Sequence, residues 1–243
     1  MKSVKSSFIE VAGLHIEVVK KAILHLHIAV YPPDGRVRVA VPLWVKDEAI
    51  RLAVLDRLAW IRRHQEKLAV QPRQSEREMV NGETHWFQGR KYRLEIRESS
   101  GREALNLKGL ATMELAVRPG SDAGHKREIL DRWYRKQLKL ELAPLVAKWE
   151  PILGVKTTSW GVRKMRTRWG SCNPTAGRLW FNLELAKKPP ECLEYVVVHE
   201  LVHLLERHHN AHFKDLMNQF LPQWPRIRDE LNAAPLGHET WEF

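Results

Sequence analysis

The chain has 243 residues, of which 44% are hydrophobic and 28% are charged. These values are typical of globular proteins and exclude a disordered, collagen-like or membrane-embedded chain. No stretch approaches the ~20 apolar residues of a membrane span, and two cysteines make no disulfide framework, so we expect a cytoplasmic protein. The net charge of +11 suggests a polyanionic partner or acidic substrates, and the positions of the 12 histidines need an explanation.

The first third of the chain alternates between apolar and polar residues, as strands do. The segments 26–30 and 37–41 flank a Pro-Pro-Asp-Gly turn at 32–35 and predict a β-hairpin. Asp47 is expected to cap an amphipathic helix. The apolar positions of this helix are Ile50, Val54, Leu58 and Ile61.

Further strand patterns lead to the clearest break in the chain. These strands are expected at 92–96, 105–107 and 113–117. The Pro- and Gly-containing segment 118–124 then interrupts the pattern. We therefore expect a β-rich N-terminal module over residues 1–122 and a second domain over 123–243.

The second half is predicted to be mainly helical. A long helix pattern covers 125–150, with Pro144 as a possible bend. Strands are expected at about 161–167 and 179–183, and helices at 187–205 and 210–220, with a further turn or two at 224–232. No internal repeat is evident in the sequence.

Positive charge is concentrated in one stretch. Residues 126–168 contain 12 Lys and Arg but 4 Asp and Glu, which accounts for +8 of the total charge of +11. Such a stretch is typical of a solvated helix face with a basic loop, or of a groove for nucleic acid or for an acidic substrate.

Residues 199–203 read His-Glu-Leu-Val-His. Side chains four positions apart on a helix share a face, so His199 and His203 can each give one ring nitrogen to a Zn²⁺ ion. Glu200 lies about 100° around the helix from His199 and can act as a general base without being a ligand. Apolar residues flank the segment, and buried polar residues are costly unless a metal satisfies them. The segment therefore predicts a zinc hydrolase.

A catalytic zinc commonly takes three protein ligands, and the third must lie beyond a chain turn. We prefer His209, which stands six residues after His203, as in the pattern H-E-x-x-H-x-x-G-x-x-H. Position 206 is Glu here and not Gly, so the turn must be built differently. Asn210 is expected to cap the next helix. The alternative third ligands are His208, His212, Asp215 and Glu230.

With these motifs the sequence resembles the YgjP-like metallopeptidase family, whose members are relatives of the SprT and WLM proteases. The matching motifs are His199 to His203 with His209 and Phe213, residues 165–173, Asn182-Leu183, residues 132–134, Trp60-Ile61 and Gly82-Glu83. The resemblance implies an α+β protein in which the β-rich N-terminal part precedes a minimal zincin-like core of long helix, short sheet, HExxH helix and closing helix. It also implies zinc ligands at His199, His203 and His209, with Glu200 as general base.

Several residues near this segment are candidates for further roles. Zincin substrates bind extended against an edge strand, and the candidate edge is the strand at 179–183. Arg168 is either a transition-state contact that stabilises an oxyanion or a structural loop residue. Tyr195 shares the face of His199 and either assists the oxyanion or packs. Gly170 is expected to permit a tight turn in the loop 168–173. Cys172 is either a thiolate that approaches the metal or a buried thiol.

Two functions from different classes are compatible with these patterns. The first is a cytoplasmic zinc-dependent metallopeptidase that hydrolyses a protein or peptide substrate, with Zn²⁺ as cofactor and no membrane partner. The second is a nucleic-acid-associated protein whose metal site is structural or vestigial, motivated by the basic stretch 126–168. The two combine in a DNA-associated protease.

Overall fold

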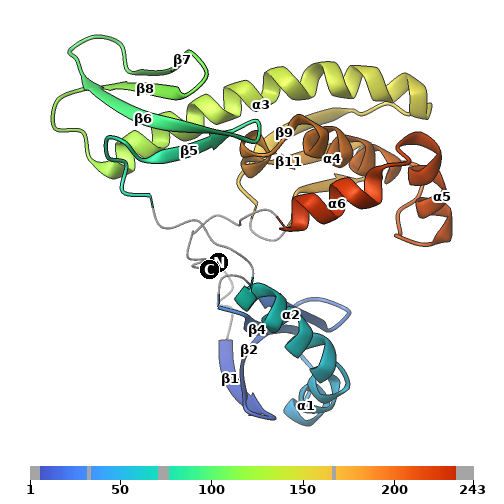
Figure 1. Cartoon of the computed structure of the whole chain (residues 1–243). Helices are drawn as coiled ribbons and strands as arrows, with labels where there is room; N and C mark the ends of the chain where they lie inside the picture. The colour runs from blue at the N-terminus through green and yellow to red at the C-terminus, as the bar shows by residue number, and fades with distance from the viewer. Residues whose placement is uncertain (1–5, 32–33, 71–76, 166–167, 234–243) are drawn as a thin grey trace. The chain divides into compact units, whose positions relative to one another are not determined.

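The computed structural model describes residues 6–31, 34–70, 77–165 and 168–233. Within them the chain has a mixed α+β fold, as predicted, with three sheets and six α-helices (Figure 1). The chain divides into two compact units, the first within residues 1–75 and the second within residues 76–234. In the described part of the chain, no helix is both long and apolar enough to cross a membrane.

The first unit is a four-stranded sheet with two helices. The predicted hairpin is confirmed, because β3 and β4 pair antiparallel; residues 32–33 of its turn lie outside the described residues. The sheet order is β1-β2-β4-β3, and β2 runs parallel to β4. The elements are β1 (Ser6–Val11), β2 (Leu14–Lys21), β3 (His27–Tyr31), β4 (Arg36–Pro42), α1 (Asp47–Asp56) and α2 (Leu58–Val70).

The prediction that Asp47 caps the helix is wrong. Lys46 is the N-cap residue, and no side chain caps α1. Asp47 is the first helical residue, where a carboxylate is favoured by the helix dipole, and it lies 3.3 Å from the Lys20 ammonium. The predicted apolar stripe is also divided between two helices, because α1 ends before Arg57 and α2 starts at Leu58.

The second unit begins with another four-stranded sheet, in which the three predicted strands are confirmed and β5 is added. The sheet order is β5-β6-β8-β7. The strands are β5 (Thr84–Phe87), β6 (Arg90–Glu98), β7 (Ala104–Lys108) and β8 (Thr112–Val117).

The two sheets share one topology, so the molecule contains a structural repeat that the sequence does not reveal. In each sheet the first two strands are antiparallel, the second and fourth are parallel, and the third and fourth are antiparallel. The turn between the first two strands also repeats 76 positions later, with φ of 50° and 77° at Ala12 and Gly13, and 48° and 74° at Gln88 and Gly89. The two copies retain a glycine at the second position of this turn.

The long helix α3 (Ala123–Leu153) joins the second sheet to the rest of the second unit. Asp122 caps its start by accepting a hydrogen bond of 2.7 Å from the His125 amide, and Gly154 ends it with φ of 66°. Figure 1 shows α3 extending along this sheet and on to the next, and it contacts β7, β8 and β9. The expected boundary after residue 122 therefore does not coincide with the division into units. The segment 118–124 contains Asp122, the N-cap residue of α3, and β5–β8 share one hydrophobic core with the later helices of the chain.

The last part of the chain holds a three-stranded sheet in the order β10-β11-β9. Two predictions are corrected here. Residues 170–173 form strand β10 rather than a loop, and the strand expected at the edge, β11, is central. A turn in which the Gly177 amide donates to the Pro174 carbonyl returns the chain antiparallel, so β10 takes the edge beside it. The elements are β9 (Ser159–Arg163), β10 (Gly170–Asn173), β11 (Arg178–Asn182), the 3-10 helix η1 (Leu183–Lys187), α4 (Pro190–Val202), α5 (Ala211–Phe220) and α6 (Trp224–Ala233).

The two equivalent turns allow a matched test of how the second sheet packs. A Cβ at Gly89 would lie 2.9 Å from Cγ of Pro189, whereas a Cβ at Gly13 meets nothing within 4 Å. Both positions have positive φ, which costs a side chain about 1–2 kcal/mol. We expect Gly89→Ala to lower the free energy of unfolding of the second unit by about 2–4 kcal/mol. Gly13→Ala should lower that of the first unit only by the about 1–2 kcal/mol that a side chain at positive φ costs. Thermal denaturation of both variants checks this, and equal costs would contradict the contact with Pro189.

Candidate metal centre

Three histidines meet where helix α4 ends. His199 lies in the last turn of α4, and His203 is its C-cap residue with φ of −65°. The chain then turns and brings His209 back, so that Nε2 of His209 lies 3.0 Å from Nε2 of His199. One ligand atom from each histidine lies within 4.8 Å of the others. In the described part of the chain, this is the only group of three or more His, Cys, Asp or Glu side chains that is arranged to hold a metal ion.

The alternatives weighed for the third position lie outside this cluster. His208, His212, Asp215 and Glu230 are described residues, and none of them joins His199 and His203. The prediction that Asn210 caps the next helix is confirmed, because its side chain accepts a hydrogen bond of 2.9 Å from the Phe213 amide.

The capped helix α5 places an aromatic ring against all three imidazoles. Phe213 is 3% exposed, and its ring centroid lies 5.0, 4.7 and 4.8 Å from those of His199, His203 and His209. The sequence shows this residue only as part of a family motif and gives it no role. Its position four after His209, on a helix with a clear N-cap, is the signal that could have found it.

Burial keeps the histidines in the neutral form that binds metals. It lowers the pKa of His199 to about 3, with a smaller contribution from His203 and His209. Burial also lowers the pKa values of His203 and His209. Nδ1 of His203 lies 3.0 Å from the Glu206 carbonyl oxygen and can only donate to it, which leaves the lone pair on Nε2.

The residues present fit a divalent metal. Three neutral imidazoles are a preferred donor set for zinc. Two nitrogens bound to one tetrahedral zinc at about 2.0–2.1 Å lie roughly 3.3 Å apart, close to the 3.0 Å between Nε2 of His199 and Nε2 of His209. The set leaves a fourth position for water or substrate, as catalytic zinc sites do.

Glu200 is buried beside this cluster, in a space that only a glycine leaves open. It is 5% exposed, and burial raises the pKa of its carboxyl to about 8 while the Arg168 guanidinium acts in the opposite direction. A Cβ on Gly170 would lie 2.4 Å from Oε1 of Glu200. Gly170 is the first residue of β10 and has no positive φ, so the expected tight turn is wrong. The residue lacks a side chain because the carboxylate occupies that space.

The other candidate residues, Arg168, Tyr195 and Cys172, differ in their burial and in their contacts with the histidines. Arg168 is exposed. Tyr195 is buried, and its ring packs edge-on against His199 at 5.7 Å between centroids. Burial raises the pKa of the Cys172 thiol to about 12, with a contribution from Glu200, and Cys172 does not join the histidine group.

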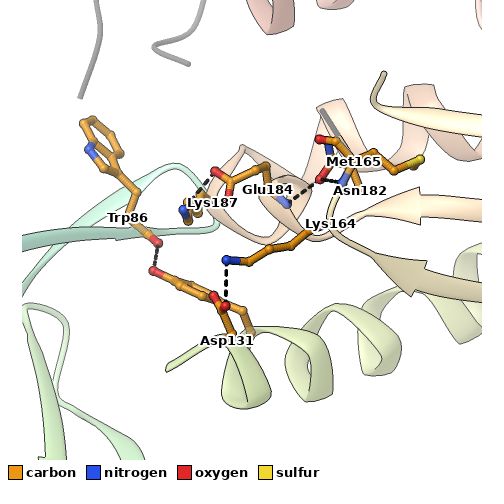
Figure 2. Close-up of polar contacts among 8 residues, drawn as sticks. Trp86, Asp131, Lys164, Met165, Asn182, Glu184 and Lys187 are labelled. Carbon is orange, nitrogen blue, oxygen red and sulfur yellow. Dashed lines mark hydrogen bonds and ion pairs between the residues drawn. The ribbon is translucent and has the colours of Figure 1, made fainter. Parts of the chain in front are cut away.

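A buried amide holds the segment that leads into β10, and the sequence identifies this residue only as part of a motif. Figure 2 shows Asn182 at the end of β11, facing Met165. Its Oδ1 accepts from the amides of Met165 and Glu184, both at 3.2 Å. Its Nδ2 donates to the carbonyls of Met165 and Arg168, both at 2.8 Å.

The three histidines form a group that can hold a metal ion, and comparison with known proteins connects the chain to a metallopeptidase family. The family model of the YgjP-like metallopeptidase domain matches residues 26–234, most of the chain. The chain therefore belongs to the YgjP-like family, as its motifs predicted.

Two solved structures also align with part of the chain. One is the metallopeptidase zymogen abylysin of Pyrococcus abyssi, with 19% identity and a TM-score of 0.35 over 37% of this chain and 90% of that one. The other is the metallopeptidase zymogen jannalysin of Methanocaldococcus jannaschii, with 17% identity and a TM-score of 0.34 over 37% and 91%. No curated protein matches the chain significantly.

The raised pKa of Glu200 predicts an unusual dependence of stability on pH in the metal-free protein. The carboxyl holds its proton more tightly in the folded state, with a pKa of about 8, than at its ordinary value of 4.5. Its contribution to the free energy of unfolding is therefore full below pH 4.5 and is lost as the pH rises through about 8. Relative to Glu200→Gln, the wild-type protein should lose a few kcal/mol, roughly 2–4, across this window. Denaturant titrations in the presence of a chelator at pH 5, 6.5 and 8 measure this, because the shared histidines cancel in the difference. Parallel curves for the two proteins would contradict the buried carboxyl.

Proposed function

We propose that the protein is a cytoplasmic zinc-dependent peptidase in which His199, His203 and His209 hold the metal and Glu200 is the general base. The observation that carries the proposal is the cluster of three histidine ligand atoms within 4.8 Å of one another. The buried Glu200 next to the first of these histidines in the sequence adds the acid–base group. A cytoplasmic location is supported by two free thiols in place of disulfides.

The residues of the chain divide the work of hydrolysis. A zinc ion bound by the histidines supplies Lewis acidity toward water and the scissile carbonyl. Glu200 takes the proton of the attacking water and delivers it to the leaving amine. Because this role needs the ionised form, the positive charge of Arg168 supports it, and a bound cation acts in the same direction.

The substrate is proposed to be an extended protein or peptide segment that pairs with β10. This strand is at the edge of its sheet, and its first residue, Gly170, lies against Glu200. Main-chain pairing with an edge strand accepts many sequences. Arg168, two residues before this strand, is proposed to stabilise the oxyanion that develops on the substrate. Tyr195 is proposed to contribute mainly by holding the His199 ring.

A nucleic-acid-associated function ranks second. It rests on the +8 charge of residues 126–168, but two of the lysines there form ion pairs, Lys148 with Glu194 and Lys164 with Asp131. Phosphate contacts would give an affinity for DNA that falls steeply with salt, so absent or salt-insensitive DNA binding would remove this function.

The role of Glu200 is tested by Glu200→Gln with Glu191→Gln as the matched control, since Glu191 is an exposed glutamate on the same helix. We expect Glu200→Gln to keep about one zinc per chain and to lower kcat/KM by about 10³-fold or more, because no group accepts the proton. Metal analysis and cleavage of a proteome-derived peptide library measure both quantities. Wild-type activity in Glu200→Gln, or equal losses in the two variants, would overturn the assignment.

The third ligand is tested by His209→Ala against His208→Ala, two neighbouring exposed histidines. Removal of a ligand should weaken zinc binding by more than the ~10–100-fold that loss of an outer partner costs, whereas His208→Ala should change it less than about threefold. Competition with a chelator of known affinity measures the two dissociation constants. A loss confined to His208→Ala, or to variants of Asp215 or Glu230, would identify a different ligand.

A further inference from the structure

We propose that Asn182 is a positioning residue for the reaction, and that it acts by holding the backbone of Arg168, two residues before the glycine that lies against Glu200. The inference rests on the proposed peptidase function. It concerns a residue that touches neither the histidines nor Glu200 in any contact of the described chain.

The amide of Asn182 is fully used. It is 5% exposed, both hydrogens of Nδ2 are donated to carbonyls, and both lone pairs of Oδ1 accept backbone amides. Only one orientation of the amide satisfies all four contacts, because carbonyls cannot donate and backbone amides cannot accept. A side chain this constrained fixes the segments that it joins.

Asn182 holds the backbone at Arg168 and at the residue that follows it. Its side chain binds the Arg168 carbonyl, and its backbone amide donates to the carbonyl of the next residue, Trp169, at 2.9 Å. The Trp169 ring is in turn covered by the ammonium of the buried Lys188, 5.3 Å from the ring centroid. Figure 2 shows that Lys164, earlier in the same segment, is tied to helix α3 through Asp131 at 2.7 Å.

This anchoring matters because Arg168 is close in the chain to the residue that borders Glu200. Arg168 stands two residues before Gly170, and the backbone of Gly170 abuts the Glu200 carboxylate. The side chain of Arg168 is exposed and has a large rotamer entropy. Its charge can favour a reacting group only if its backbone is held in place. Asn182 supplies that constraint from the end of the neighbouring strand.

A purely structural role for Asn182 makes a different prediction, and a double-mutant cycle separates the two. Asn182→Asp keeps the size of the side chain and its acceptor oxygen but loses the donor to Met165 and Arg168. If Asn182 acts through Arg168, the change lowers kcat/KM by about tenfold or more in the wild type, mainly through kcat, and by less than about twofold in Arg168→Ala. A structural role lowers activity by the same factor in both backgrounds.

The experiment uses the full chain and a quenched fluorescent peptide chosen by cleavage profiling of the wild type. Asn106→Asp, the same change at an exposed site on β7, is the matched control and should leave kcat/KM within about twofold. Zinc content and the unfolding midpoint are measured for each variant. Lys188→Met provides a second variant, which removes the charge over Trp169 and keeps an apolar side chain. It should lower kcat a few-fold in the wild type and not in Arg168→Ala.

Failure of the role of Asn182 can be distinguished from failure of the proposed peptidase function. Equal losses for Asn182→Asp in the two backgrounds, or no loss in the wild type, overturn this inference while Glu200→Gln remains inactive. Should Asn182→Asp fail to fold, equal effects of Lys188→Met in the two backgrounds overturn it instead. Retained activity of Glu200→Gln overturns the proposed function itself.

Discussion

Three imidazoles and one carboxyl lie together at the end of α4, where Glu200 is buried, His199 and His203 are half-buried and His209 is exposed. Three imidazoles and one carboxyl would each cost free energy in an apolar environment. The carboxyl fits only because Gly170 has no side chain, and the imidazoles pack against the Phe213 ring. Burial holds the imidazoles neutral, which is the state that gives lone pairs to a metal. The burial that costs free energy thus also keeps the imidazoles in the form that binds a metal.

The turn after α4 shows how this chain departs from the longer H-E-x-x-H pattern. Where that pattern has Gly, residue 206 is Glu, and its backbone has no positive φ that would require glycine. Its carbonyl accepts a hydrogen bond from Nδ1 of His203, and its carboxylate accepts one of 2.9 Å from the His208 amide. One residue therefore orients a candidate ligand and closes the turn that returns His209.

Local patterns predict the parts of this structure that depend on local physics. The helix that ends at the first two histidines, the Asn210 cap and the hairpin at β3–β4 all follow from periodicity and turn residues. The central place of β11 cannot be predicted, because strand order depends on pairing between distant segments. Gly170 resembles a turn residue in the sequence because the group that needs its space, Glu200, is 30 positions away in the chain. The segment 118–124 resembles a linker because a helix cap and a linker use the same residue types.

The repeated sheet topology explains why β5–β8 belong with the site rather than with a separate module. In the second copy, the turn between the first two strands packs on the end of η1 and on Pro189, the N-cap residue of α4. The Gln88 amide donates to the Ala186 carbonyl at 2.9 Å, and the Gly89 amide to that of Lys187 at 3.2 Å. In the first copy, the same turn has the same backbone conformation, but a Cβ at Gly13 would meet nothing within 4 Å. One copy thus fixes the residues that lead into the helix of His199 and Glu200. The segment 182–190 joins strand β11 to the helix that carries His199 and Glu200. The buried amide of Asn182 constrains its first end, and the second sheet constrains its other end.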